Sequence, residues 1–267
     1  MKDIIITSLE TIDAYDISTD GYLFTLDELT DAKIANTEDK TDITGKGGRK
    51  LSSIKKNKAV TVSGTNGLVS GHLLALQTGG DFAEKDDAEV KWTDYLTVSS
   101  DKATTTGKAI GTTGAEIGGV YVKEKDGSLG TEYKQAAAAA AGKFAYNPAN
   151  KELTFNSGDI EDGTEIIVVY KRKVKAHVLE NISDQYSKKC KLYINALGED
   201  RCGNTYKIQF FIPKADFNGN FDFEMGENQT VQAFEAESLA GSCDAGGALW
   251  RYTVIGFNND GTVTDAA

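Results

Sequence analysis

Proline, cysteine, histidine and methionine are all scarce in this chain. Its 267 residues include 2 Pro, 3 Cys, 2 His and 2 Met, against 28 Gly, 11 Phe and 11 Tyr. Few prolines combined with many aromatic residues and glycines favour long strands joined by Gly, Asn and Asp turns. We therefore expect an all-β fold, a sandwich or a barrel.

The cysteines exclude two ways of stabilising a small fold. Cys190, Cys202 and Cys243 are an odd number and form no C-x-x-C pair. A disulfide framework uses paired cysteines, and a structural zinc site uses closely spaced ligands. We expect reduced thiols, no metal site and no cofactor.

Long apolar runs are also missing. No stretch approaches the roughly 18 apolar residues that span a bilayer. The first residues, MKDIIITSLETIDAY, carry acids where a signal peptide has an apolar run. We expect no membrane contact and no secretion.

Basic residues are fewer than acidic ones, so the formal net charge is −11. Such a chain repels phosphate backbones and anionic lipids unless a local basic patch overrides the net charge. Two patches exist, GKGGRKLSSIKKNK at residues 45–58 and YKRKVK at residues 170–175. We interpret them as a solvated loop and a charged strand edge, with DNA contact as the alternative.

Signatures of catalysis are few. His72 lies in an apolar segment, and His177 has no H-x-H, H-E-x-x-H or nearby cysteine partner. No G-x-S-x-G elbow, Walker loop or dinucleotide fingerprint is present. We expect no enzyme. Hydrolysis by two carboxylates stays open, because such pairs have no fixed spacing.

Strand signals recur along the chain, as in a sandwich or barrel. Asp126-Gly127 and Asp162-Gly163 each predict a hairpin turn, the second leading into a long Ile/Val-rich strand. The other predicted strands cover residues 4–7, 21–26, 59–64, 191–196, 206–212, 221–225, 231–237 and 249–256.

Three segments depart from this pattern. Residues 30–58 contain few large apolar side chains and predict a loop or an extended arm. The alanine run at residues 135–142 favours a helical turn connecting two strands. Residues 100–175 are rich in Gly and Thr, which suggests a β-rich subdomain inserted into a single domain that spans residues 1–267.

One helix is predicted, at about residues 69–78. Val69, His72, Leu73 and Leu76 recur at helical spacing, which places them on one apolar stripe. Ser70 is placed to cap the N-terminus, and Gly79 and Gly80 end the helix. The glycines do not form a phosphate loop, since no Gly-Lys-Ser/Thr follows. We expect scaffold or subunit contact.

An acidic hairpin is predicted at residues 221–237. Strand alternation separates Asp222 and Glu224 from Phe221, Phe223 and Met225, and likewise Glu235 and Glu237 from Phe234 and Ala236. Paired through GENQ, the two strands would carry four carboxylates on one face, where like charges repel. A solvated outer face, a calcium site without EF-hand spacing, or a lining for an anionic molecule would each explain them.

The C-terminal part, GNTYKIQFFIPKADFNGNFDFEMGENQTVQAFEAESLAG followed by LWRYTVIG, resembles the major tail tube proteins of long-tailed bacteriophages and related prophage particles. The segment KAVTVSGTNGLVSGHLLALQTGGDF is similar to the part of that family where a strand leads into a helix packed beside the sandwich.

This resemblance implies a structural virion protein whose hexameric rings stack into a tube that conducts DNA without binding it tightly. Asp222, Glu224, Glu235 and Glu237 would then face the lumen, and the helix would brace the wall near a subunit junction. Residues 30–58 would reach the next ring through a set of charged residues: Asp39, Lys46, Arg49, Lys50, Lys55 and Lys56. Implied partners are further copies and other tail proteins such as a tape measure, sheath or terminator. The implied location is the virion tail, assembled in the host cytoplasm.

The alternative function is a virion decoration or carbohydrate-binding β-sandwich module. Such a module presents exposed aromatic side chains on one sheet face. Trp92, Tyr121, Tyr133 and Tyr146 are the candidates for that platform.

Overall fold

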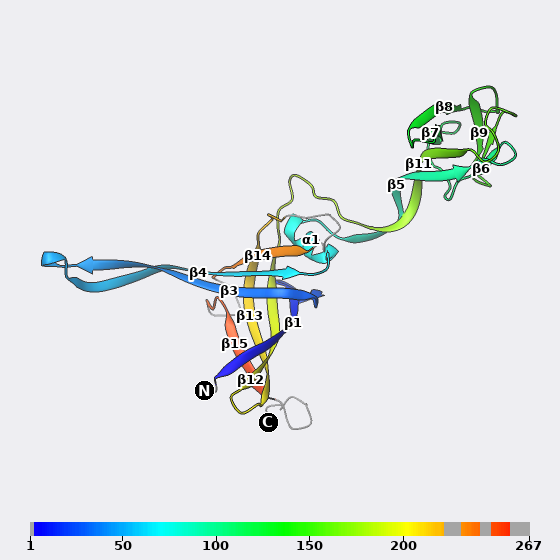
Figure 1. Ribbon diagram of the computed structural model, residues 1–267. Helices are drawn as coiled ribbons and strands as arrows, with labels where there is room; N and C mark the ends of the chain where they lie inside the picture. Colours follow the sequence, from blue (N-terminus) through cyan, green and yellow to red (C-terminus); the bar gives the residue numbers. More distant parts are fainter. Residues whose placement is uncertain (1–2, 222–230, 241–246, 257–267) are drawn as a thin grey trace. The chain divides into compact units, whose positions relative to one another are not determined.

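The computed structural model describes residues 3–221, 231–240 and 247–256 (Figure 1). The chain divides into two compact units. Unit 1 comprises Met1–Phe82 and Leu179–Ala267, and unit 2 comprises Ala83–Val178. Each unit is built on its own β-sheet, with one α-helix in unit 1. The predicted all-β fold with a short helix is therefore confirmed.

Unit 1 contains an eight-stranded antiparallel sheet in the order β2-β1-β12-β13-β14-β4-β3, and β15 also pairs with β13. The strands are β1 (Ile4–Asp16), β2 (Tyr22–Leu26), β3 (Leu29–Thr44), β4 (Lys50–Asn66), β12 (Lys189–Asp200), β13 (Thr205–Phe217), β14 (Gln232–Ser238) and β15 (Arg251–Gly256). Four strands, β1, β4, β12 and β13, are longer than predicted, because pairing with neighbours extends strands into polar sequence, whereas β2 and β15 are shorter.

The core of unit 1 lies on one face of this sheet. Alternate residues of the strands point to that face, and their apolar side chains pack together with two leucines of the helix. Its members include Ile12, Phe24, Val62, Leu192, Ile194, Ile212, Phe217, Phe234, Leu73 and Leu76.

Helix α1 (Gly71–Thr78) is shorter than predicted but capped as expected. Ser70 accepts a hydrogen bond from the Leu73 amide at 3.3 Å, and Gly79 closes the helix with φ of 81°. Because the helix begins after Ser70, Val69 lies outside it and is exposed. His72 is also exposed. The predicted stripe therefore loses Val69, which lies outside the helix; of its other members Leu73 and Leu76 are buried and His72 is exposed.

Unit 2 contains a seven-stranded sheet in the order β5-β11-β7-β8-β9-β10-β6. The strands are β5 (Ala83–Thr97), β6 (Lys102–Thr104), β7 (Ile117–Lys123), β8 (Leu129–Gln135), β9 (Lys143–Asn147), β10 (Glu152–Phe155) and β11 (Glu165–Val178). All neighbours are antiparallel except β8 and β9. A separate core includes Val120, Tyr133, Phe144, Leu153, Ile166, Val168 and Tyr170.

Asp126-Gly127 is confirmed as a hairpin turn, because β7 pairs with β8; Asp162-Gly163 forms a turn, but the predicted hairpin is wrong there because β10 and β11 are not neighbours in the sheet. Gly127, between β7 and β8, has φ of 84°, and Gly163, before β11, has φ of 88°; both are left-handed conformations that favour glycine. The alanine run connects β8 to β9 as predicted, but it forms bends and a turn. The helical turn is therefore wrong, because six alanines between two strands are too short to sustain a helix.

Two of the three cysteines fall within the described residues. Cys190 is a buried free thiol and Cys202 an exposed one. Burial raises the pKa of the Cys190 thiol, so it stays protonated and unreactive. Cys243 lies outside the described residues.

Candidate assembly surfaces

The β14 strand carries the part of the predicted acidic face that the structure describes. Gln232, Phe234, Ala236 and Ser238 are buried, and the residues between them are exposed. Glu235 and Glu237 therefore lie on the solvent face of the sheet, as strand alternation predicted. Asp222 and Glu224 lie outside the described residues.

The register of β14 differs from the predicted hairpin. Glu237 lies opposite Asp216 of β13 on one side and Thr61 of β4 on the other. The Asn218 amide donates to the Glu235 carbonyl at 2.8 Å. Residues 215–218 therefore occupy the positions opposite Glu235 to Ser238 on this side of β14. The prediction overlooked that β13 continues as far as Phe217 and forms this pairing itself.

Glu235 has small polar neighbours on β4, and charges of both signs lie further out: Lys33 of β3 stands opposite Ser63, and Lys189 pairs with Asp216 at 3.4 Å. The β4 neighbours of Glu235 in this face are Thr61, Ser63 and Thr65. A hollow of about 700 Å³ beside it is lined by Asp31 and Glu235 and, in the part of the chain that the structure describes, by no lysine or arginine. The described lining of the hollow is therefore acidic, whereas the surrounding sheet face carries both charges.

Residues 30–58, predicted as a loop or an arm, form a long hairpin of β3 and β4. The two strands pair from Leu29 and Asn66 out to Thr44 and Lys50, and a 3₁₀ turn at Lys46–Gly48 joins them. The extended arm is confirmed and the loop is wrong, because the two polar strands satisfy each other's backbone. β14 pairs with β4 only from Val60 to Asn66. Residues 37–58, hereafter the arm, extend away from the rest of unit 1 (Figure 1).

Charges on the arm are partly paired within it. Lys55 and Glu38 form an ion pair at 2.7 Å, and Lys50 and Asp42 form another at 2.7 Å. Asp39 accepts a hydrogen bond from the Asn57 side chain at 2.8 Å. Among the predicted contact residues of the arm, Lys46, Arg49 and Lys56 have no carboxylate partner within the described ranges.

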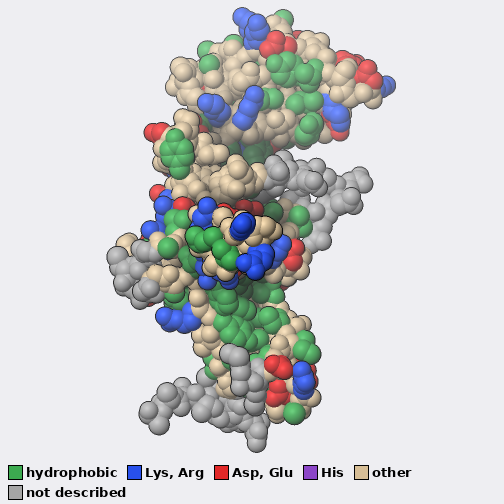
Figure 2. Space-filling model, turned by 90° about the vertical axis from the view of Figure 1, so that its left-hand side faces the viewer, with side chains coloured by type: hydrophobic (Ala, Val, Ile, Leu, Met, Phe, Trp, Pro, Cys, Tyr) green, Lys and Arg blue, Asp and Glu red, His purple; other side chains and the backbone are tan. Residues whose placement is uncertain are grey.

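The end of the arm is apolar as well as basic. Ile43, Leu51 and Ile54 are 43%, 65% and 53% exposed. Figure 2 views the molecule with the end of this hairpin toward the reader and shows hydrophobic side chains beside a group of Lys and Arg. A two-stranded ribbon has no hydrophobic core in which these side chains could be buried, so they stay exposed unless another surface covers them.

Helix α1 is fastened to β14 by two buried glutamines. Gln232 accepts from the Ser70 amide at 2.7 Å and donates to Gln77 at 3.1 Å, and Gln77 donates to the Ala233 carbonyl at 3.1 Å. Both glutamines are almost fully buried. Sequence analysis missed this clamp, because the two residues are far apart in the chain and neither belongs to a motif.

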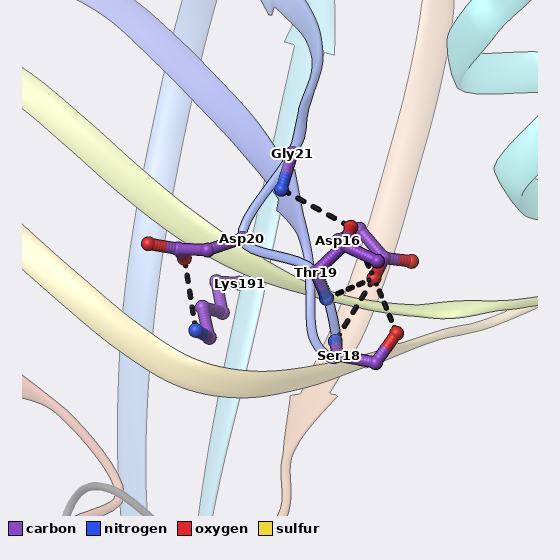
Figure 3. Close-up of polar contacts among 6 residues, drawn as sticks. All are labelled: Asp16, Ser18, Thr19, Asp20, Gly21 and Lys191. Carbon is purple, nitrogen blue, oxygen red and sulfur yellow. Dashed lines mark hydrogen bonds and ion pairs between the residues drawn. The ribbon is translucent and has the colours of Figure 1, made fainter.

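The β1–β2 turn is built around one carboxylate. Asp16 accepts hydrogen bonds from the backbone and side chains of Ser18 and Thr19 at 2.6 to 2.9 Å (Figure 3). The side-chain hydrogen bond of Ser18, followed by the bonds of Thr19, holds the Asp16 pKa well below its usual range. Asp20 pairs with Lys191 of β12 at 2.9 Å. The turn positions the short strand β2 at the sheet edge.

In unit 2 a buried carboxylate joins β5 to the loop after β6. Asp94 accepts from the Thr106 amide at 2.8 Å and hydroxyl at 2.7 Å, from the Tyr170 hydroxyl at 2.8 Å and from Trp92 at 3.0 Å. Burial raises the Asp94 pKa, but these hydrogen bonds outweigh it and hold the pKa below its ordinary value. Every acceptor position is used within the fold, so Asp94 is structural.

The aromatic platform predicted for a carbohydrate module does not form. Tyr133 is buried in the core and donates its hydroxyl to the Asp159 carbonyl. The Tyr146 hydroxyl accepts from the Ala109 amide. Only Trp92 of the four is more than one third exposed, and Arg172 lies over its ring. The sequence pattern did not show whether each tyrosine side chain points into the core or toward solvent.

The two histidines lie on different elements, His72 on α1 and His177 on β11. The His72 ring packs edge-on against Phe82, and His177 lies on β11 opposite Glu84. In the described ranges, no group of three or more His, Cys, Asp or Glu side chains is arranged to hold a metal ion. The helix found there is too short to cross a bilayer.

Residues 4–250 match the model of the YomU/Tube protein family. The chain belongs to the YomU/Tube family. The match spans both units, so unit 2 lies inside the family's extent. No curated protein matches the chain.

Membership in the YomU/Tube family confirms the coarser part of the resemblance, a structural protein of a phage tube. Such proteins are in general structural and without enzymatic activity.

Proposed function

We propose that this YomU/Tube protein is the repeating subunit of a phage tail tube, in which hexameric rings stack around an acidic lumen. The ring number comes from the resemblance to major tail tube proteins. The observation that carries the proposal is the exposed face of β14, where Glu235 and Glu237 stand among small polar residues of β4.

An acidic wall suits the passage of DNA. A row of carboxylates repels phosphates, whereas a basic lumen would retain the strand through counterion release. Repeating Glu235 and Glu237 around a ring multiplies this effect. Assembly also covers the open edges of the unit 1 sheet, which a free subunit would have to protect.

The arm supplies the contact between rings in this proposal. Lys46, Arg49 and Lys56 would meet acidic residues of the next ring, while Lys50 and Lys55 stiffen the ribbon through their pairs with Asp42 and Glu38. Helix α1 would hold β14 in place near a subunit junction through Gln77 and Gln232. Tape measure, sheath or terminator proteins would bind the finished tube in a virion tail assembled in the host cytoplasm.

Electron microscopy of the purified chain tests the proposal. We expect rings or tubes, and a cryo-EM map in which Glu235 and Glu237 line the bore. A map that places β14 on the outer wall would refute the acidic lumen. A chain that stays monomeric at every concentration would refute the tube.

A charge reversal tests the lumen directly. Glu235→Lys with Glu237→Lys should leave the fold intact, because both side chains are exposed, and should make tubes retain short duplex DNA at low salt. The matched control is Glu132→Lys with Glu161→Lys, the same charge change at exposed positions of unit 2. Equal retention by the two variants would contradict the assignment of Glu235 and Glu237.

A further inference from the structure

Unit 1 contains an open apolar groove in addition to the arm. Its volume is about 470 Å³, and its walls include Ile6, Leu9, Ile34, Phe210 and Trp250 from four parts of the chain. An apolar cavity of about 150 Å³ already holds a benzene-sized group. This groove can therefore accept more than one aliphatic side chain.

We propose that the end of the arm of one copy, through Ile43, Leu51 and Ile54, docks into this groove of a second copy. The proposal rests on the proposed function, since it identifies the surface that receives the arm. Figure 2 shows hydrophobic side chains gathered on the face of unit 1 below the hairpin, in addition to those at its end.

Charge argues for a second copy as the occupant. The arm carries seven basic and three acidic residues, although the whole chain has a net charge of −11. The two segments that supply the β1 and β3 walls of the groove, residues 3–10 and 27–36, contain five acids and one lysine. Among the described lining residues of the groove the one charged side chain is Asp31, so a basic apolar end would meet an apolar receptor with a carboxylate in its wall, which favours association.

The arm cannot reach the groove of its own chain. Asn36, in the groove wall, and Thr44, at the end of β3, lie on one continuous strand. At about 3.3 Å per residue, the strand separates them by roughly 25 Å. The contact is therefore between copies and joins two different surfaces, so it repeats from copy to copy in a ring or a stack.

Disulfide trapping between two variants tests the contact. Ile54→Cys places a thiol on the arm, and Ile6→Cys places one on the groove, where Ile6 is 53% exposed. Both are made with Cys202→Ser and Cys243→Ser, while Cys190 stays because it is buried. The two proteins are mixed, oxidised and analysed by non-reducing gel and peptide mass spectrometry.

We expect the arm–groove disulfide to exceed a decoy pair by about tenfold, the scale of one interface anchor. The decoy replaces Ile6→Cys with Leu129→Cys, an exposed leucine of unit 2. Equal yields for groove and decoy, or a predominance of arm–arm disulfides, would overturn the proposal.

Charge exchange provides an independent readout. Lys46→Glu with Arg49→Glu on the arm partner should lower the yield of the arm–groove disulfide. Glu10→Lys with Asp31→Lys on the groove partner should restore it, and salt should weaken both effects. If the two groove substitutions do not restore the disulfide yield, the charges of the arm bind a surface other than this groove.

The outcomes separate this inference from the tube itself. Tubes seen by microscopy without an arm–groove disulfide would leave the tube standing and place the arm elsewhere. An arm–groove disulfide in a sample without tubes would establish the contact and contradict the tube. Capture of the groove by another tail protein in place of a second copy would also refute the inference.

Discussion

The arm and unit 2 both interrupt the sequence of unit 1, and they differ in what holds them together. Unit 2 brings a core of its own, with Phe144, Leu153 and Ile166 fully buried. The arm brings none, since every residue from 38 to 58 is at least partly exposed. The family match covers both. Unit 2 therefore contains the kind of core that independent folding requires, whereas the arm contains none and, in our proposal, meets a second copy.

The difference follows from where each segment places its apolar residues. In unit 2, Val120, Ile166 and Val168 point to the same face of neighbouring strands and pack together. In the arm, Ile43 and Ile54 have only a second strand beside them and no layer above. A two-stranded ribbon is marginal in water by itself. Its order depends on attachment to β14 at one end and, in our proposal, on another copy at the other end.

Removing the arm should have the largest effect, and only on assembly. Thr37 and Ala59 are paired residues, so an Asn-Gly turn can replace residues 38–58 between them. We expect tubes and rings to disappear, while the free energy of unfolding changes by less than about 1 kcal/mol because no buried residue is lost. Sedimentation velocity and urea unfolding measure the two effects. Normal tubes would show that the arm is dispensable.

A core truncation in unit 2 should act in the opposite way. Phe144→Ala removes a fully buried ring and should lower the free energy of unfolding of unit 2 by about 3–5 kcal/mol. Hydrogen exchange resolved by residue should show faster opening of β7 to β11 and unchanged protection in β1 and β12. Leu129→Ala, at an exposed position of the same unit, is the control. Loss of protection throughout both units would show that the cores unfold together.

The sequence was most informative where a single local rule decided the structure. Ser70 and Gly79 marked the helix ends, Gly127 and Gly163 marked turns, and alternation placed Glu235 and Glu237 on one face. Each of these follows from the conformation of one residue and its neighbours.

Features that depend on distant partners could not be predicted. The polar strands of the arm exist because they pair with each other, and no apolar period announces that pairing. The register that places Glu237 opposite Asp216 is set by the length of β13. The Gln77–Gln232 clamp joins residues from different parts of the chain, and Tyr133 is buried because a core forms above it.

The buried carboxylate of unit 2 allows a test of intermediate size. Asp94→Asn keeps the shape but turns an amide group toward the donors Thr106 and Tyr170, and should cost about 1–3 kcal/mol. Hydrogen exchange in β5 and β11 measures it. Tyr170→Phe removes the donor to Asp94 and the acceptor of the buried Gly107 amide, and should cost a comparable amount. Equal stability of Asp94→Asn and the native chain would contradict the role of these hydrogen bonds.

The pH dependence of unit 2 should reflect the same residue. The pKa of Asp94 is lower in the folded state than its unfolded value of about 3.9. Its stabilising contribution is therefore complete above about pH 4 and is lost as the pH falls through the folded pKa. In a plot of the free energy of unfolding of unit 2 against pH, Asp94→Asn should reduce the slope on the acid side. An unchanged slope would assign the acid sensitivity to other carboxylates.

The exposed ion pair of the arm should give the smallest effect. The Lys55 hydrogen bond lowers the pKa of Glu38, but both side chains are open to water, where screening leaves such a pair little net energy. Glu38→Gln should leave the unfolding midpoint unchanged at neutral pH. It should also leave tube formation intact, because Glu38 only stiffens a ribbon whose proposed contacts lie at Ile43, Leu51 and Ile54. If tubes are lost with the fold unchanged, the pair itself would be part of the contact, and the arm would bind its partner along its length.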